Sequence, residues 1–261
     1  MRSHFTVVTS VALFLTSLTN GVSVGDLPAA ITGTYNVSFL LAEVPIALAQ
    51  SFVPTSYTLL PPNETFFPGI TDGNVPLFLE LGREANAGPP LLNFENFQEA
   101  KLEVPNVQRL SDSEIPFLYK RWIAVDNQLD VFGSLTDFGL NTSFNSFSPA
   151  NSSNSTVYDY SIVSAIDATL EPLLEGENLR WPLETYERIG GMPWFAEYLT
   201  CAQHFYNWTA QDGTSFLRGN ITLHPPYAGP GVFNPVTYPV QGINGVFEFK
   251  IVGPLICEEF V

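Results

Sequence analysis

The stretch that decides the fold spans residues 97–144 and reads FQEAKLEVPNVQRLSDSEIPFLYKRWIAVDNQLDVFGSLTDFGLNTSF. It opens with a strand-like segment in which residues two apart share a face, so Glu99, Lys101 and Glu103 point the same way. The residues alone leave two interpretations of this face open. It is either a solvated outer surface with charges of mixed sign, or a polar interior where burial and the lysine set the carboxylate pKa values.

The rest of the stretch adds a second predicted strand and a bend. The run IPFLYKRWIAVDN carries Lys120 and Arg121 at adjacent positions of an alternating strand, so at most one of these two side chains faces inward. The pair Asp126 and Asn127 ends the run as a turn. The two glycines of the following VFGSLTDFGL indicate tight bends.

The first residues predict a secretory signal peptide over residues 1–22. Arg2 supplies a positive charge, residues 7–18 are mostly apolar, and residues 19–25 offer small or polar positions for cleavage. The apolar run is short and interrupted by hydroxyl residues, which disfavours the alternative of an uncleaved membrane anchor. We therefore expect a secreted protein with no membrane span and a single domain over residues 23–261.

Sequons and cysteines agree with a secretory route. Glycosylation motifs of the form N-x-Ser/Thr occur at Asn36, Asn63, Asn141, Asn151, Asn154, Asn207 and Asn220. The polar tract that contains Asn151 and Asn154 is predicted to be a surface loop. The mature chain holds two cysteines, Cys201 and Cys257, which we expect to form a disulfide in an oxidising compartment, with two buried free thiols as the alternative.

Composition indicates a mainly β chain. Hydrophobic residues make up 45% of the 261 residues, enough for a large core, and 21 prolines interrupt the chain too often for long helices. The formal net charge is −16, with 10 lysines and arginines in total, which argues against a nucleic-acid backbone or an anionic membrane as partner. We interpret this acidity as solubility in an acidic medium, with cation binding as the alternative.

Patterns outside the central stretch predict further elements. Strands are expected over residues 34–41 and 76–82, and a short helix follows Pro45 in IALAQSF. In the C-terminal half, strands are expected over residues 157–170, 193–210 and 214–224, and FEFKIVGPLIC closes the domain.

The order of these features resembles the acetoacetate decarboxylase family. That order is a strand with Glu99, a Val-Pro pair, an aromatic strand, V-D-N and a glycine-bearing bend. In the family, a Tyr-x-Glu strand is followed by I-P or V-P, a strand ending in L-D-N, then G-R-E and P-K-K-L-G. The resemblance covers residues 33–147 and implies a single-domain antiparallel β-barrel with a few short helices and a buried central cavity.

The resemblance also implies a site. It places Glu99 on the pocket glutamate of the family, which favours the inward interpretation of its strand face. We take Glu99 as a candidate general acid or base, with an adjacent donor at Tyr119 or His204, although a lone histidine among aromatic residues is more often structural. The candidate substrate contacts are Lys101, Tyr35 and Asn141.

The departures from the family concern the lysine. The Schiff-base lysine of the family should fall near Asn141 or Thr142, and its G-R-E becomes Gly133-Ser134-Leu135 here. Lys101 is a poor substitute, because neighbouring carboxylates would hold it protonated as an ion-pair partner. Asn141 is also a sequon residue, so either this sequon is silent or the segment lies outside the cavity.

Two functions remain. One is a secreted lyase-like or isomerase-like enzyme that acts on a small carbonyl or carboxylate compound without a lysine imine, in natural-product formation of the fungal type. The alternative is a non-catalytic protein of the same fold whose pocket binds a small molecule. No G-x-S-x-G, P-loop, H-E-x-x-H or C-x-x-C motif is present, and three histidines disfavour a metal site, so we expect neither cofactor nor metal. The oligomeric state is not determined by these features.

Overall fold

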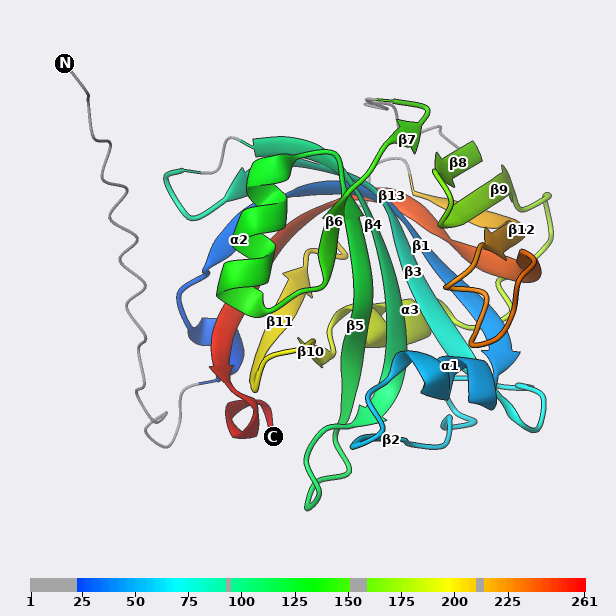
Figure 1. The fold of residues 1–261 in the computed structure, drawn as a ribbon, viewed down its shortest axis with the longest axis horizontal. Helices are drawn as coiled ribbons and strands as arrows, with labels where there is room; N and C mark the ends of the chain where they lie inside the picture. The colour runs from blue at the N-terminus through cyan, green and yellow to red at the C-terminus, as the bar shows by residue number, and fades with distance from the viewer. Residues whose placement is uncertain (1–22, 93–94, 151–158, 210–213) are drawn as a thin grey trace.

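The computed structural model describes residues 23–92, 95–150, 159–209 and 214–261. The predicted signal peptide and the sequons at Asn151 and Asn154 therefore lie outside the described residues. The chain forms a 13-stranded sheet in which seven strands close into a barrel through the pairing of β1 with β13 (Figure 1). This confirms the mainly β, barrel-type fold that the sequence predicts.

The ring of the barrel runs in the order β1, β3, β4, β5, β10, β11, β13 and back to β1. All of these neighbours are antiparallel except β5 and β10, which are parallel. The bounds of the ring strands are β1 Ile31–Pro45, β3 Asn74–Gly88, β4 Glu95–Gln108, β5 Pro116–Val125, β10 Pro193–Phe195, β11 Thr200–Tyr206 and β13 Val236–Ile256.

A second layer covers part of the outer face of the barrel. It continues from the first half of β13 through the strands β12 Ser215–Leu223, β9 Ile166–Pro172, β8 Asp159–Ile162 and β7 Phe147–Ser148. Between this layer, helix α1 (Ile46–Phe52) and the outward side chains of the barrel lies one hydrophobic core, with Leu79, Leu102 and Ile221 among its members. Two short strands extend the edges, β2 (Thr58–Leu59) beside β4 and β6 (Thr142–Phe144) parallel to β5.

A second hydrophobic core fills the barrel interior. It is built from the alternate residues of the ring strands, such as Tyr35, Phe39 and Phe247, all of which are fully buried. Helix α3 (Leu183–Gly190) adds Tyr186 and Ile189 to this interior core. Two single-turn 3-10 helices, η1 (Val24–Asp26) and η2 (Cys257–Phe260), lie near the ends of the described chain.

Glycine permits the sharp curvature of the ring at two positions. A Cβ atom on Gly82 of β3 would lie 2.2 Å from the carbonyl oxygen of Asn36 in β1. A Cβ atom on Gly242 of β13 would lie 2.1 Å from the carbonyl oxygen of Phe39, also in β1. Both distances are far below van der Waals contact, so β1 approaches its two neighbours closely only because these residues have no side chain.

Helix α2 (Gln128–Phe138) corrects the expectation of tight bends after Asn127. The side chain of Asn127 accepts a hydrogen bond from the Leu129 amide at 2.9 Å and so caps the start of the helix. Gly133 lies inside the helix with open space around it, whereas Gly139, at φ 66°, ends the helix in the left-handed conformation. Only Gly139, the second glycine of this segment, ends the helix.

Other predicted elements are confirmed with changes of boundary. The predicted strands over residues 34–41 and 76–82 belong to the longer β1 and β3, and the helix after Pro45 is α1. The single strands predicted over residues 157–170 and 193–210 are each divided. Ser164, at φ 60°, lies in the turn between β8 and β9, and the second segment forms β10 and β11.

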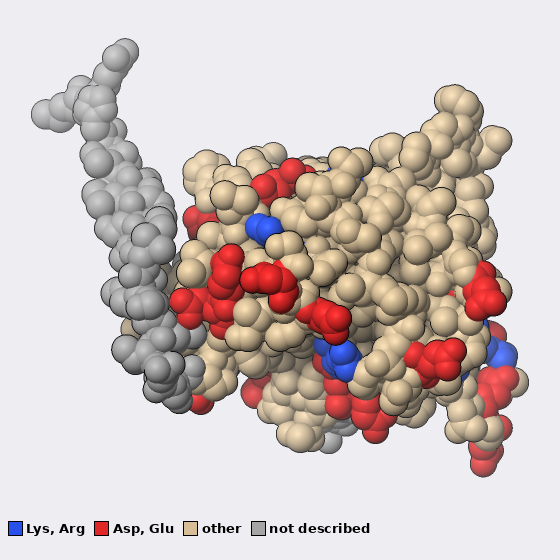
Figure 2. Space-filling view, turned by 90° about the horizontal axis from the view of Figure 1, so that it is seen from below, with Lys and Arg blue, Asp and Glu red and all other residues tan. Residues whose placement is uncertain are grey.

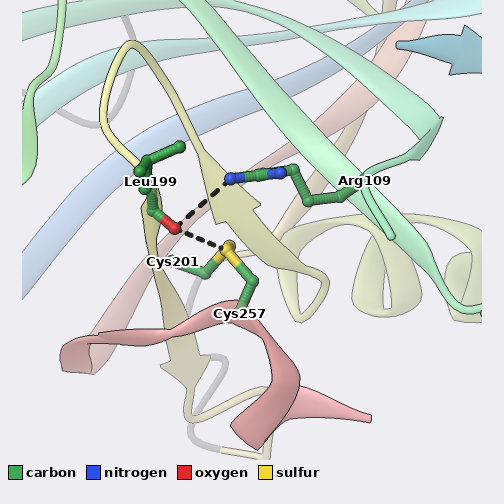
Figure 3. The surroundings of a disulfide bond; sticks show 4 residues. All are labelled: Arg109, Leu199, Cys201 and Cys257. Carbon is green, nitrogen blue, oxygen red and sulfur yellow. Dashed lines mark hydrogen bonds between the residues drawn. A yellow bond between two sulfur atoms is a disulfide. The ribbon is translucent and has the colours of Figure 1, made fainter. Parts of the chain in front are cut away.

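The predicted disulfide between Cys201 and Cys257 is present and ties β11 to η2 (Figure 3). The carbonyl oxygen of Leu199 accepts a hydrogen bond from Nη2 of Arg109 at 3.3 Å and lies 3.2 Å from Sγ of Cys257. Because a sulfur in a disulfide carries no hydrogen, the second approach is a close contact and not a hydrogen bond. The Arg109 guanidinium also lies 5.1 Å from the ring of Phe195, which links this corner to β10.

The face of the molecule in Figure 2 carries scattered acidic side chains and few basic ones. Two of the three lysines of the chain, Lys101 and Lys120, are buried at 3% and 1% exposure and add no charge to the surface. No helix within the described part of the chain has the length and apolar character needed to cross a membrane.

Candidate active site

The charged face of β4 lies inside the barrel. Glu99, Lys101 and Glu103 are 5%, 3% and 0% exposed, respectively. The alternate residues Ala100 and Leu102 pack instead in the core between the barrel and its outer layer. Of the two interpretations that the sequence left open, the buried interior is therefore correct, and the solvated outer surface is excluded.

Lys101 is the centre of this interior charge cluster. Its Nζ atom lies 2.8 Å from Glu99, 2.9 Å from Glu80 and 3.5 Å from Glu84. The face of the Tyr35 ring lies 4.7 Å from the same ammonium group. One cation from β4 is thus surrounded by three carboxyl groups and an aromatic ring from β1, β3 and β4.

The environment keeps Lys101 protonated. Burial lowers the pKa of its ammonium group, but the carboxylates of Glu80 and Glu99 and the nearby tyrosines outweigh this effect and hold that pKa well above its ordinary value. An amine held in this state has no free lone pair and cannot attack a carbonyl group. Lys101 is consequently an ion-pair partner, as expected from its neighbours.

Glu84 carries a proton in this cluster. Burial, followed by repulsion from Glu99, raises the pKa of Glu84 well above its ordinary value, although Lys101 opposes the shift. A hydrogen bond between the two carboxyl groups acts in the same direction, because it needs one of them to be protonated. Glu84 and Glu99 are therefore two buried carboxyl groups beside a fixed positive charge, and protonation is favoured at Glu84.

A second ion pair lies farther along the interior. The Lys120 ammonium group contacts Glu103 at short range and lies 5.0 Å from the centre of the Trp194 ring. Burial raises the pKa of Glu103 to about 7, with Lys120 opposing and Glu80 adding to the increase. Of the neighbours Lys120 and Arg121, only Lys120 faces inward, as strand alternation requires.

His204 lies in the same interior, at 4% exposure. Its ring is stacked on Tyr206, with centroids 5.4 Å apart, and lies 5.6 Å from the Trp194 ring. Burial lowers the pKa of His204 well below its ordinary value, and the two lysines add to this decrease, so the imidazole is neutral. Its ring contacts are with the aromatic side chains of Trp194, Tyr206 and Phe249.

Tyr119 and Asn141 are not in the interior, which corrects two sequence-based assignments. Tyr119 adjoins the inward-facing Lys120, so it points to the outer face, where its ring lies 5.2 Å from Phe195 and its hydroxyl donates to Glu197 at 3.4 Å. Asn141 is exposed and donates to the carbonyl oxygen of Arg121 at 3.3 Å. The sequon segment around Asn141 lies outside the barrel, the second of the two alternatives considered for it.

The positions that resemble the arginine and lysine of the family carry hydroxyl groups. Ser134 stands in the second position of the segment that replaces G-R-E, and Thr142 is one of two candidates for the lysine position. Their hydroxyl oxygens lie 2.8 Å apart in a hydrogen bond between α2 and β6. The two segments are therefore close together, but neither supplies a cation here.

Three interior residues escaped the sequence analysis. Glu80 and Glu84 lie on one face of β3 because they are four residues apart in a strand, and this period-2 spacing was the signal that could have found them. Tyr206, on β11, donates to Glu80 at 3.3 Å, and no sequence signal ties these two positions together.

Polar groups of the interior leave some hydrogen-bonding capacity unused. Among the described residues, the fully buried hydroxyl of Tyr35 has no hydrogen-bond partner, so its ring rather than its hydroxyl contacts Lys101. Across the same described ranges, no group of three or more His, Cys, Asp or Glu side chains is arranged to hold a metal ion. The chemistry open to this site is acid–base chemistry by carboxyl groups beside a fixed ammonium group.

Comparison with solved structures shows that the chain has the acetoacetate decarboxylase-like fold. An acetoacetate decarboxylase from Legionella pneumophila subsp. pneumophila matches 91% of this chain and 98% of its own, with a TM-score of 0.55 and 12% sequence identity. The enduracididine biosynthesis enzyme MppR, with HEPES bound, matches 90% of each chain with a TM-score of 0.49 and 10% identity. An acetoacetate decarboxylase-like enzyme from Sphingomonas wittichii RW1 matches 91% and 98% with a TM-score of 0.41 and 10% identity.

At such low identity, the similarity to the Legionella structure concerns the fold alone. No protein-family model matches the sequence, and no curated protein matches it either. The fold that the resemblance implied is therefore confirmed.

Proposed function

We propose that this chain is a secreted enzyme that acts on a small carbonyl or carboxylate compound by carboxyl acid–base chemistry, without a lysine imine. One observation carries the proposal. Two buried carboxyl groups, Glu84 and Glu99, approach the same protonated Lys101 at 3.5 Å and 2.8 Å, and the environment keeps a proton on Glu84. Pairs of carboxyl groups with separated proton affinities are a common basis for acid–base catalysis.

Each member of the cluster has a distinct role in this proposal. Glu99 accepts a proton from the substrate, and Glu84 donates one to the atom that develops negative charge. The Lys101 ammonium group attracts a substrate carboxylate or stabilises an oxyanion. Glu80, at 2.9 Å from Lys101, keeps that lysine protonated and directed into the interior.

The absence of an imine is supported by the state of Lys101. Its raised pKa leaves the amine protonated, whereas imine formation needs an unprotonated amine. The hydroxyl groups of Ser134 and Thr142, at positions that resemble the charged residues of the family, cannot form an imine. We therefore propose a lyase or isomerase step that depends on general acid–base catalysis alone.

Substrate would enter from the end of the barrel next to α2. Asp130, in the first turn of α2, is half-buried. Burial is the largest cause of its raised pKa, and repulsion from Glu99 and then Glu95 adds to the increase. Asn127 of the same helix start donates to Glu95 at 3.3 Å. These interactions connect α2, in which only Phe138 is buried, to the neighbourhood of Glu99.

The test uses Glu99→Gln and Glu84→Gln, with acetoacetate and pyruvate as probe substrates. These two small oxo acids carry the carboxylate and carbonyl groups that the cluster is proposed to bind. The matched control is Glu103→Gln, which changes a buried glutamate of the same strand in the other ion pair. We expect turnover of a probe to fall at least about 100-fold in the first two variants and to persist in the control.

The same variants separate the enzyme from the second candidate, a non-catalytic pocket protein of the same fold. A ligand of that protein would be apolar, because interior side chains such as Phe39 and Phe78, whose rings are stacked 5.8 Å apart, are aromatic. Lost turnover with retained binding of the probe supports the enzyme, and unchanged turnover in Glu99→Gln removes Glu99 from the site. Treatment with borohydride in the presence of each oxo acid gives a further check, since a stable covalent adduct on a lysine would contradict the proposed chemistry.

Secretion and glycosylation are part of the proposal. A disulfide suits an oxidising compartment, and the sequon residues Asn63, Asn207 and Asn220 are exposed, while Asn36 is half-buried. Treatment of the protein from a eukaryotic host with an N-glycosidase should lower its mass, and N-terminal sequencing should begin near residue 23. A role in natural-product formation is tested by the genes that neighbour this one in the genome.

A further inference from the structure

We propose that Tyr160 is a positioning residue for Glu99, an inference that rests on the proposed role of Glu99. Tyr160 belongs to β8, in the layer outside the barrel. Its hydroxyl lies 3.0 Å from the carbonyl oxygen of Gly82 and 3.2 Å from the carbonyl oxygen of Glu99. A single hydroxyl proton is therefore shared between two backbone carbonyls of the barrel wall.

The two carbonyls belong to residues that face each other across the wall. Gly82 of β3 is paired with Glu99 of β4 in the ladder between these strands. Gly82 also has no side chain, which lets β3 approach β1 closely. A Cβ atom at this position would lie 2.2 Å from the carbonyl oxygen of Asn36. The Tyr160 hydroxyl thus bonds to β3 at Gly82, where the barrel curves sharply, and to β4 at Glu99, the candidate base.

The surroundings of Tyr160 keep its hydroxyl protonated, so that it can donate a hydrogen bond. It is 5% exposed, and its ring packs edge-on against Phe147 at a centroid distance of 5.7 Å. Burial, followed by the negative charges of Glu99 and Asp126, raises the pKa of Tyr160 far above its ordinary value, so the hydroxyl stays protonated. Its two acceptors are backbone carbonyl oxygens at paired positions of the barrel wall.

Loss of this hydroxyl should act on the side chain of Glu99. The backbone of Glu99 fixes the direction from which its carboxylate reaches Lys101 at 2.8 Å. Without the shared proton, the backbone at the Gly82–Glu99 pair loses its anchor to the outer layer, and the ion pair on the inner face loosens. A merely structural role would lower stability without a selective change at Lys101.

The experiment compares Tyr160→Phe with Tyr186→Phe in the full mature chain. Tyr186 is a matched control, because it is fully buried in the interior core and its hydroxyl has no hydrogen-bond partner among the described residues. The measurement is the hydrogen-exchange rate of the two buried ammonium groups by nitrogen-15 NMR. The Lys101 signal is assigned through the Tyr35 ring at 4.7 Å and the Lys120 signal through the Trp194 ring at 5.0 Å.

We expect exchange at Lys101 to accelerate several-fold relative to Lys120 in Tyr160→Phe, while the ratio of the two rates stays unchanged in Tyr186→Phe. Equal acceleration at both lysines, or no change at either, overturns the proposal. Because this readout needs no turnover, it is independent of the Glu99→Gln assay. A selective effect at Lys101 together with an active Glu99→Gln variant would support positioning by Tyr160 and reject Glu99 as the base.

Discussion

The hydroxyl of Tyr206 donates to the carboxylate of Glu80 at 3.3 Å, although their strands lie on opposite sides of the barrel. Strands β11 and β3 are not neighbours in the ring, so this hydrogen bond crosses the interior. Through Glu80 it reaches Lys101 and the two other glutamates of the cluster. A change of protonation in the cluster therefore affects contacts made by both β3 and β11, and the stability of the barrel should depend on pH.

Stability should decrease as the pH rises from about 4.5 to about 7. The pKa of Glu103 is raised from 4.5 to about 7 in the folded protein, so its contribution is complete below pH 4.5 and is lost as the pH rises through 7. Glu84, whose pKa is also raised, acts in the same direction, while His204, whose pKa is lowered, opposes them below pH 6.5. Each group changes the free energy of unfolding by up to about 1.4 kcal/mol per pH unit.

Urea unfolding at pH 4.5, 6 and 8 measures this dependence. Glu103→Gln cannot titrate, so the difference between wild type and this variant isolates Glu103. That difference should shift in favour of the variant as the pH rises. A difference that is constant across the range would mean that the proton affinity of Glu103 is not raised in the folded state.

Asp130→Asn should stabilise the protein more at pH 8 than at pH 5. Burial and then Glu99 and Glu95 raise the pKa of Asp130 to about 7, so its carboxylate is ionised under repulsion at pH 8 and protonated at pH 5. We expect a gain of about 1 kcal/mol at the higher pH, measured by urea unfolding. Asp137→Asn, at an exposed position in the same helix, is the control. A loss of stability at pH 8 would contradict the inferred repulsion.

Gly82→Ala should be strongly destabilising, by about 3 kcal/mol or more. The added methyl group would collide with the backbone oxygen of Asn36, which cannot move without opening the β1–β3 ladder. Gly133→Ala is the matched control, because its Cβ has open space inside helix α2 and alanine favours the helix by about 1 kcal/mol. Thermal unfolding should show opposite signs for the two variants, and equal effects would contradict the close approach of β1 and β3.

The double variant Cys201→Ala/Cys257→Ala should lose about 4 kcal/mol of stability, given the 56-residue separation of the two cysteines. The bond limits the unfolded chain, so the loss should appear as a lower urea midpoint in non-reducing buffer. Wild type in a reducing agent should approach the variant. Glu84, Glu99 and Lys101 of the candidate site are on β3 and β4, so probe turnover at low temperature should persist in the variant.

Composition predicted a mainly β chain, the family resemblance implied the barrel, and strand alternation predicted one face of β4. Alternation established that Glu99 and Lys101 share a face, but it does not say which side of a closed sheet that face adopts, and the family resemblance supplied the direction. The sequence offers Tyr119 as a donor next to Glu99, whereas the inward position of Lys120 turns Tyr119 to the other side. Tyr206 joins the cluster through contacts across the barrel, which no local pattern encodes.

The pairing of β1 with β13 joins the first strand of the chain to the last. β13 is 21 residues long and holds β1 on one edge while β12 and then β11 occupy the other. The ring cannot close until β13 has left the ribosome, and contacts between strands so distant in sequence make folding slow. A chain that stops before β13 would keep an unpaired edge on β1 and expose the ammonium and carboxyl groups of its interior to water.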